Sequence, residues 1–130
     1  MARILVVEDE KAIRNVLRNI LLNENSTHQV DEAEDGVEAI ARLTEATYDL
    51  VLCDIKMPQK DGLEVLEYAM EHYADTPFVM ISGHGDLDTA VQCIRKGAYD
   101  YIAKPPDLNR LVTTVRQALD RKKLLQENQR

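Results

Sequence analysis

The sequence predicts an α/β protein in which five parallel strands alternate with five helices that cover both faces of a doubly wound sheet. Two observations support this prediction. Short apolar runs rich in β-branched residues alternate with longer segments whose apolar residues recur at helical spacing. The apolar runs are unbroken, as in parallel strands that are buried on both faces. Alternation of this kind favours right-handed βα units.

The first half of the chain contains three of the predicted strands. Residues 4–7 and 50–53 are unbroken apolar runs that are too short for helices, so each is predicted to be a buried strand. A more polar strand begins at residues 28–30, which favours a position near an edge of the sheet. A helix is predicted over about residues 10–23, and another follows the turn at residues 35–36.

The second half continues the alternation. A loop over residues 57–62 leads into a helix, and strands are predicted over residues 78–81 and 101–103. A helix over about residues 86–96 lies between these strands, and the final helix begins near Asp107. One face of the helix over residues 86–96 carries an apolar stripe made of Leu87, Ala90, Val91 and Ile94.

Composition limits the classes of partner and compartment. The net charge of -7 argues against a general nucleic-acid binder, so we expect no direct nucleic-acid contact. Cys53 and Cys93 are too few for a disulfide framework and lie in apolar stretches, so we expect buried thiols in a reducing cytoplasm. No signal peptide or membrane-length apolar run is visible, so a soluble protein without membrane contact is expected.

The length of 130 residues fits one domain. We predict that this domain covers residues 1–120, because the helical apolar pattern ends at Leu119. Residues 121–130 are polar and are expected to be the start of a linker or a frayed extension of the last helix.

Reactive side chains follow four of the predicted strands. These residues are Glu8 and Asp9 after the first strand, Asp54 after the third, Ser82 after the fourth and Lys104 after the fifth. A single acid in such a place is often only a helix cap. Ligands of open parallel sheets, however, bind beyond the carboxyl ends of the strands, where all of these side chains are expected to meet.

The chemistry of this set favours phosphoryl transfer. Clustered carboxylates repel one another unless a cation intervenes, and their hard oxygens suit Mg²⁺ or Mn²⁺. A carboxylate beside such an ion can act as a nucleophile toward phosphorus, which makes Asp54 the candidate phosphoacceptor. Lys104 and the Ser82 hydroxyl could each cover one phosphoryl oxygen. Without a base to activate water, the acyl phosphate would persist, as a switch requires.

These residues also resemble the motif of bacterial response-regulator receiver domains over about residues 3–119. The motif consists of Glu8-Asp9, Asp54 with Met57-Pro58 and Asp61-Gly62, then Ser82, and finally Lys104-Pro105. The resemblance implies a flavodoxin-like (CheY-like) fold with strand order 2-1-3-4-5. It also implies a cis bond between Lys104 and Pro105. A minor departure is Ser82, where many relatives have threonine.

By this resemblance, Asp54 takes its phosphoryl group from a sensor histidine kinase. Mg²⁺ would be bound by Asp9, Asp54 and the Lys56 carbonyl, with Glu8 assisting through water. The protein would catalyse only its own phosphorylation and slow dephosphorylation, so it is not expected to be an enzyme with turnover.

Three further residues are candidates for switching and for control of lifetime. Tyr101 would swing inward on activation, together with movement of Ser82, although it could instead be a plain packing tyrosine. Lys56 and His84 lie two residues after Asp54 and Ser82 and would tune the lifetime of the acyl phosphate. His84 is not expected to be a metal ligand, because no cysteine or second histidine lies on its segment.

A narrower resemblance concerns residues 82–85, 89–91, 96–101 and 127–128, which are similar to receivers of NtrC-type transcription activators. It implies control of a transcription-activating module. The expected output surface is formed by the fourth helix, the fifth strand and the fifth helix, and a homodimer could form through it. Charged residues predicted on this surface are Arg95, Lys96, Asp100, Asp107 and Arg110.

Three other functions would also fit parts of the pattern. A phosphatase of the haloacid-dehalogenase type also uses an aspartyl nucleophile, but it needs an aspartate where this chain has Lys56. A flavodoxin-like electron carrier needs aromatic residues around its flavin, and this chain has no tryptophan and one phenylalanine. A purely structural adaptor would leave the acidic cluster unexplained.

Overall fold

The computed structural model describes residues 1–57, 59–83 and 87–128, with side chains described as far as residue 124. It contains a five-stranded parallel sheet in the order β2-β1-β3-β4-β5, which confirms the predicted fold. The strands are β1 (Arg3–Val7), β2 (Gln29–Ala33), β3 (Leu50–Asp54), β4 (Phe78–Ser82) and β5 (Asp100–Ala103). The helices are α1 (Lys11–Glu24), α2 (Gly36–Glu45), α3 (Gly62–His72), α4 (Leu87–Arg95) and α5 (Leu108–Asn128).

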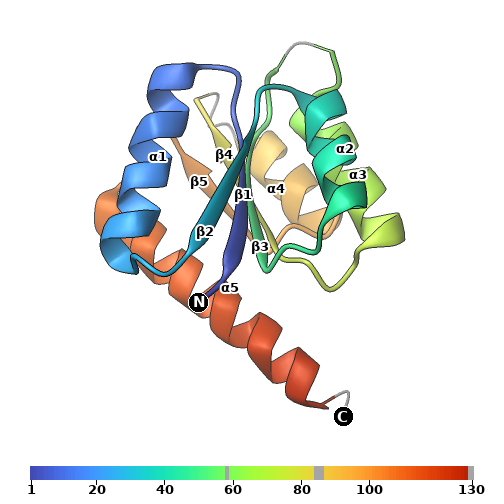
Figure 1. The fold of residues 1–130 in the computed structure, drawn as a ribbon. Coiled ribbons are helices and arrows are strands. Elements are labelled where there is room, and N and C mark those ends of the chain that lie inside the picture. The colour runs from blue at the N-terminus through green and yellow to red at the C-terminus, as the bar shows by residue number, and fades with distance from the viewer. Residues whose placement is uncertain (58, 84–86, 129–130) are drawn as a thin grey trace.

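The helices cover the two faces of the sheet unequally. Helices α1 and α5 lie on one face, and α2, α3 and α4 lie on the other (Figure 1). The more polar strand β2 forms one edge of the sheet, as its sequence predicted, and β5 forms the other. No helix in the described part of the chain is both long and apolar enough to cross a membrane.

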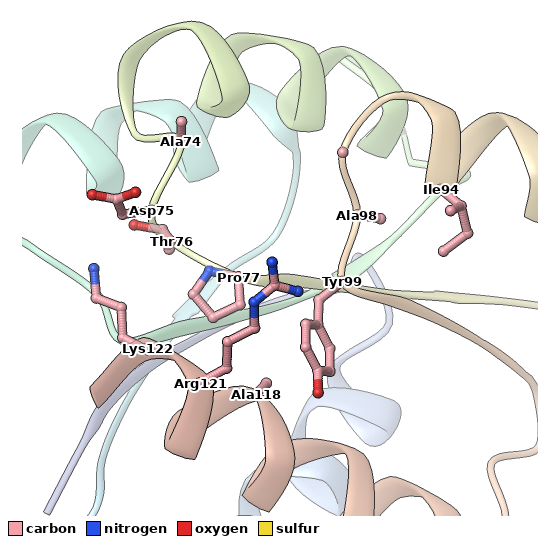
Figure 2. A pocket seen from close by; sticks show the side chains of 11 residues that line it. Ala74, Asp75, Thr76, Pro77, Ile94, Ala98, Tyr99, Ala118, Arg121 and Lys122 are labelled. Carbon is pink, nitrogen blue, oxygen red and sulfur yellow. The ribbon is translucent and has the colours of Figure 1, made fainter. Parts of the chain in front are cut away.

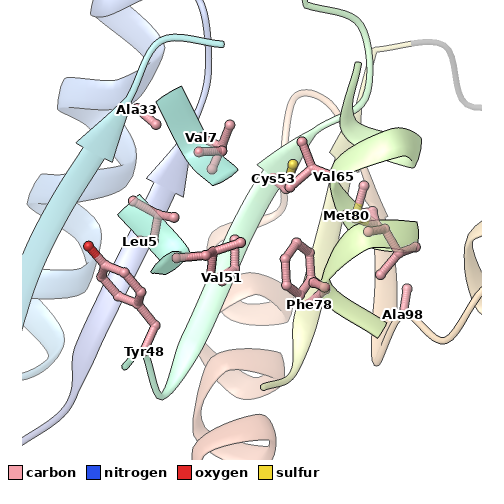
Figure 3. Packing of buried hydrophobic residues seen from close by; sticks show 14 of the residues in the cluster. Leu5, Val7, Ala33, Tyr48, Val51, Cys53, Val65, Phe78, Met80 and Ala98 are labelled. Carbon is pink, nitrogen blue, oxygen red and sulfur yellow. The ribbon is translucent and has the colours of Figure 1, made fainter. Parts of the chain in front are cut away.

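The core is divided by the sheet into two clusters, because successive strand residues point to opposite faces. In β1, Leu5 and Val7 belong to the cluster under α2, α3 and α4, which Figure 3 shows. Ile4 and Val6 belong to the cluster under α1 and α5. Every residue of β3 and β4 is buried, which explains their unbroken apolar runs.

The structure confirms the prediction for the two cysteines, but it places the apolar stripe of α4 on the side away from the core. Cys53 and Cys93 are both free and buried, as predicted. The apolar stripe along α4 faces outward, with Leu87 78% and Ile94 51% exposed. Cys93 is instead the residue that α4 buries, so the periodicity identified the helix but not the side that meets the core.

The last helix continues past the predicted domain boundary at residue 120, without a break, to Asn128. Its residues 121 and 122 still contact the body of the domain. The Arg121 guanidinium carbon lies 5.7 Å from the centre of the Tyr99 ring, and Lys122 is buried. Both line a cavity of about 380 Å³ with Pro77, at the edge of the sheet where β4 begins (Figure 2). The boundary at residue 120 stays a prediction.

Candidate phosphoacceptor site

The strand register brings the predicted site residues to one edge of the sheet. Val7 pairs with Cys53, Asp54 with Ile81, and Ser82 with Ala103. The residues at the carboxyl ends of β1, β3, β4 and β5 therefore lie in one row across four neighbouring strands.

Lys104 joins two of the acids across this row. Its Nζ atom makes an ion pair with Glu8 Oε1 and lies 3.4 Å from Asp54 Oδ1. The Lys104 N–H donates to the Ser82 carbonyl at 2.9 Å, which ties the backbone of Lys104 to the end of β4. The peptide bond between Lys104 and Pro105 is cis, as expected. Glu8 is 1% exposed, so its negative charge is compensated by Lys104 inside the protein.

Asp54 is the last residue of β3 and is only 7% exposed. Its Oδ1 accepts a hydrogen bond from the Ile55 N–H at 2.9 Å. Burial raises the pKa of Asp54 from its ordinary range, Lys104 and the Ile55 N–H act in the opposite direction, and Asp9 raises it further. Asp54 is thus a buried carboxylate with a cation beside it, which suits a nucleophile.

Glu8, Asp9 and Glu10 form an acidic cluster at the start of α1. One carboxylate oxygen from each lies within 4.8 Å of the others, and the Glu10 N–H donates to Glu8 Oε2 at 3.1 Å. A hydrogen bond to Glu8 raises the pKa of Asp9, and burial adds to the effect. Hard oxygens that repel one another in this way fit a divalent cation such as Mg²⁺. The cluster includes the predicted ligand Asp9 and adjoins Asp54, while Lys56 is exposed on the loop after it.

The predicted switch residues lie on β4 and β5, on the other side of β3 from this cluster. Ser82 ends β4 and is buried, and Tyr101 lies on β5, partly buried against the core cluster under α2, α3 and α4. His84 and Pro58 lie outside the described residues. The structure therefore brings Asp54, Lys104 and Glu8 into contact and places Ser82 on the adjacent strand end.

The chain matches the response regulator receiver domain family over residues 4–116. It belongs to that family. This membership favours the receiver-domain interpretation over the phosphatase, electron-carrier and adaptor alternatives.

Individual relatives agree with this assignment. The transcriptional regulatory protein ResD of Bacillus subtilis is 44% identical over 119 residues, which cover 92% of this chain and 48% of ResD. The crystal structure of NtrX from Brucella abortus is 40% identical with a TM-score of 0.89, over 98% of this chain and 29% of NtrX. The beryllofluoride-activated NtrC4 receiver domain dimer is 34% identical with a TM-score of 0.87, over 94% of this chain and 99% of that receiver domain. The chain spans about half of ResD and less than a third of NtrX. It is a receiver domain of the kind found in transcriptional regulators of two-component systems.

Gly62 of this receiver domain has a structural role that the motif alone does not reveal. Its N–H donates to the Ile55 carbonyl at 2.7 Å, while Asp61 caps α3 by accepting from the Glu64 N–H at 3.0 Å. A Cβ atom on Gly62 would lie 2.1 Å from the Asp54 carbonyl oxygen. Glycine therefore allows α3 to begin directly against the backbone of Asp54.

Arg14 is a residue near the site that sequence reasoning did not identify. It is 7% exposed, and its Nη1 atom donates to the Glu8 carbonyl oxygen at 2.8 Å. Its position relative to Leu17 and Leu21, three and seven residues later, places it on the buried stripe of α1. A charged residue on an apolar stripe is the signal that could have revealed it.

Proposed function

We propose that this receiver domain accepts a phosphoryl group on Asp54 from a sensor histidine kinase in a reaction that requires Mg²⁺ or Mn²⁺. The observation that carries the proposal is the position of Asp54, buried at the carboxyl edge of the sheet with its Oδ1 3.4 Å from the Lys104 ammonium. Glu8 on the neighbouring strand end shares the same ammonium.

The transfer is a displacement at phosphorus. An Asp54 carboxylate oxygen forms a new P–O bond while the P–N bond of phosphohistidine breaks, and the electron pair returns to the imidazole nitrogen. Lys104 would exchange part of its contact with Asp54 for a phosphoryl oxygen, and the Ser82 hydroxyl would donate to another. Bound by Asp9, Asp54 and the Lys56 carbonyl, with Glu8 assisting through water, the cation would neutralise charge on the phosphoryl group.

Phosphorylation would change the surface formed by α4, β5 and α5. Ser82 would move toward the phosphoryl group, and Tyr101 would turn into the space behind it. The NtrC4 receiver domain, activated with beryllofluoride, is a dimer, which supports a similar response here. The names of the relatives support control of transcription by the whole protein. In this proposal the protein acts in the cytoplasm, and this domain makes no direct contact with nucleic acid or membrane.

Phosphorylation by a small donor tests the proposal without knowledge of the kinase. Incubation with acetyl phosphate and Mg²⁺ should add one acid-stable, base-labile phosphoryl group, measured by intact mass. Asp54→Asn should gain none, and removal of the cation with EDTA should prevent labelling of the wild type. Asp88→Asn is the matched control, because Asp88 is exposed on α4.

Two results would contradict this assignment. Full labelling of Asp54→Asn would place the phosphoryl group on another residue. Sustained turnover of p-nitrophenyl phosphate would support the phosphatase alternative, because a receiver that only phosphorylates itself should show none.

A further inference from the structure

We infer that Arg14 is a positioning residue for the cation site, because its guanidinium group donates hydrogen bonds to the backbone of the acidic cluster. The inference rests on the proposed function, in which Asp9 and Glu8 serve the bound cation. Arg14 itself is buried under the loop and offers no oxygen, so it would act only through these two residues.

The contacts of Arg14 join the acidic loop to β2 and to the loop after it. Nη1 donates to the carbonyl oxygens of Glu8 at 2.8 Å and Asp9 at 3.4 Å. Nε donates to Glu32 Oε1 at 3.1 Å, and Nη2 lies 3.6 Å from Glu34 Oε1. One guanidinium group therefore ties the residues after β1 to two carboxylates of the neighbouring strand and its loop.

This arrangement has two physical effects on the acids. The N–H donors of the planar guanidinium have a fixed geometry. The bond from Nε to Glu32 therefore also orients Nη1, which donates to the Glu8 carbonyl. The positive charge also lies beneath a cluster of three carboxylates that repel one another. Groups that orient metal ligands from outside typically affect metal affinity by about 10- to 100-fold when they are removed.

Arg18 provides an internal comparison. It bonds the same Glu32, with Nη1 at 3.4 Å from Oε2, and it donates to the Val30 carbonyl at 3.2 Å. Within the part of the chain that the structure describes, the hydrogen bonds and ion pairs of its side chain lie on β2 and do not include Glu8 or Asp9. A general effect of arginine charge or of ion pairing with Glu32 should thus be shared by Arg14 and Arg18, whereas positioning of the acidic loop should belong to Arg14 alone.

The test is calorimetric titration of the 130-residue chain with Mg²⁺, without phosphoryl donor. Arg14→Met should weaken Mg²⁺ binding by about tenfold. Arg14→Lys should weaken it less, because an ammonium group can still donate to one carbonyl but cannot make all the contacts of the guanidinium group. Arg18→Met should bind like the wild type. Metal-free hydrogen exchange gives a second measure, because the Glu10 amide donates to Glu8 Oε2 and should exchange faster only in the Arg14 variants.

The possible outcomes separate this inference from the proposed function. If the wild type binds Mg²⁺, Asp9→Asn binds it weakly and Arg14→Met binds it like the wild type, the role of Arg14 is overturned while the metal site stands. An equal loss in Arg18→Met would also overturn it. If Asp9→Asn binds like the wild type, the metal site and this inference both fail. Should Arg14→Met not fold, wild-type affinity in Arg14→Lys would overturn the inference.

Discussion

Single residues at the site are subject to opposing electrostatic influences. Burial raises the pKa of Asp54, and the Lys104 ammonium offsets only part of this effect, so the pKa stays above its ordinary range. Lys104 has the same balance with the opposite sign: burial lowers its pKa, but its two carboxylate partners outweigh that effect, so its pKa is raised. The Lys104 ammonium is therefore stabilised by Glu8 and Asp54, whereas the Asp54 carboxylate is stabilised by Lys104 but remains disfavoured by its burial. Lys56 differs from them, because it is exposed on the loop that follows Asp54.

Lys56 is the residue at which the lifetime of the acyl phosphate can be tested. We predict that Lys56→Ala shortens the half-life of phosphorylated Asp54 by about threefold, roughly 0.7 kcal/mol in the barrier. The physical reason is that a long cationic side chain would screen the phosphorus from attacking water. The measurement is loss of the phosphoryl group over time by mass spectrometry, after removal of acetyl phosphate.

Lys60→Ala is the control for this lifetime. Lys60 lies on the same loop but pairs with Glu64 at 3.6 Å, so its removal should leave the half-life unchanged. An equal or longer half-life in Lys56→Ala would show that Lys56 does not protect the acyl phosphate.

At the scale of elements, the junction between β3 and α3 determines where the phosphoacceptor lies. Helix α3 begins at Gly62, whose backbone is hydrogen-bonded to Ile55 and packed against the carbonyl of Asp54. The contact is between two backbones, so neither partner can move aside by changing a rotamer. The position of Asp54 is therefore coupled to the absence of a side chain at residue 62.

We predict that Gly62→Ala lowers the free energy of unfolding by about 2 kcal/mol or more, because the new methyl group overpacks a rigid contact. Urea unfolding measures the loss, and labelling by acetyl phosphate should slow because the backbone of Asp54 is displaced. Gly83→Ala is the matched control, since the nearest atom to its Cβ would be Lys104 Cδ at 4.0 Å. Its stability should stay within about 0.5 kcal/mol of the wild type. Equal stability of both variants would show that the contact at Gly62 relaxes freely.

At the scale of the whole molecule, the surface formed by α4, β5 and α5 carries both exposed apolar residues and charges. Some of its charges already have partners within the chain. Arg110 pairs with Asp100 at 3.1 Å, and Lys96 pairs with Glu67 of α3. Arg95 is exposed and makes no ion pair with any residue that the structure describes, so it is the basic residue of α4 best placed to meet a second copy.

We predict that beryllofluoride with Mg²⁺ increases self-association of the wild type and that Arg95→Glu reduces the increase. A two-fold axis repeats each contact, so two pairs worth up to about 1 kcal/mol each would change the dimer dissociation constant by up to about 30-fold. Light scattering with and without beryllofluoride measures the mass. Arg42→Glu on α2 is the control with the same change of charge, and it should dimerise like the wild type. Identical masses in all conditions would exclude this surface as a dimer interface.

The sequence alone determined much of the fold. The apolar runs of residues 4–7, 50–53 and 78–81 identified the three interior strands, because unbroken apolar runs are typical of parallel strands that are buried on both faces. The weaker pattern at residues 28–30 correctly predicted an edge strand. Parallel pairing also brings strand ends together, so the meeting of Asp54 and Lys104 followed from the order of elements.

The tertiary structure decided what depends on packing between elements. Periodicity located α4 but not its orientation, since only the path of the chain determines which side of a short helix meets the sheet. The contact of Gly62 with the Asp54 backbone and the bond of Arg14 to the Glu8 carbonyl each join the end of a strand to the helix that follows it, and both depend on how the loop between them folds back. Sequence patterns record the burial of side chains, so they can single out Arg14, but its acceptor and the partner of Gly62 are main-chain carbonyls, which every residue carries and no pattern distinguishes.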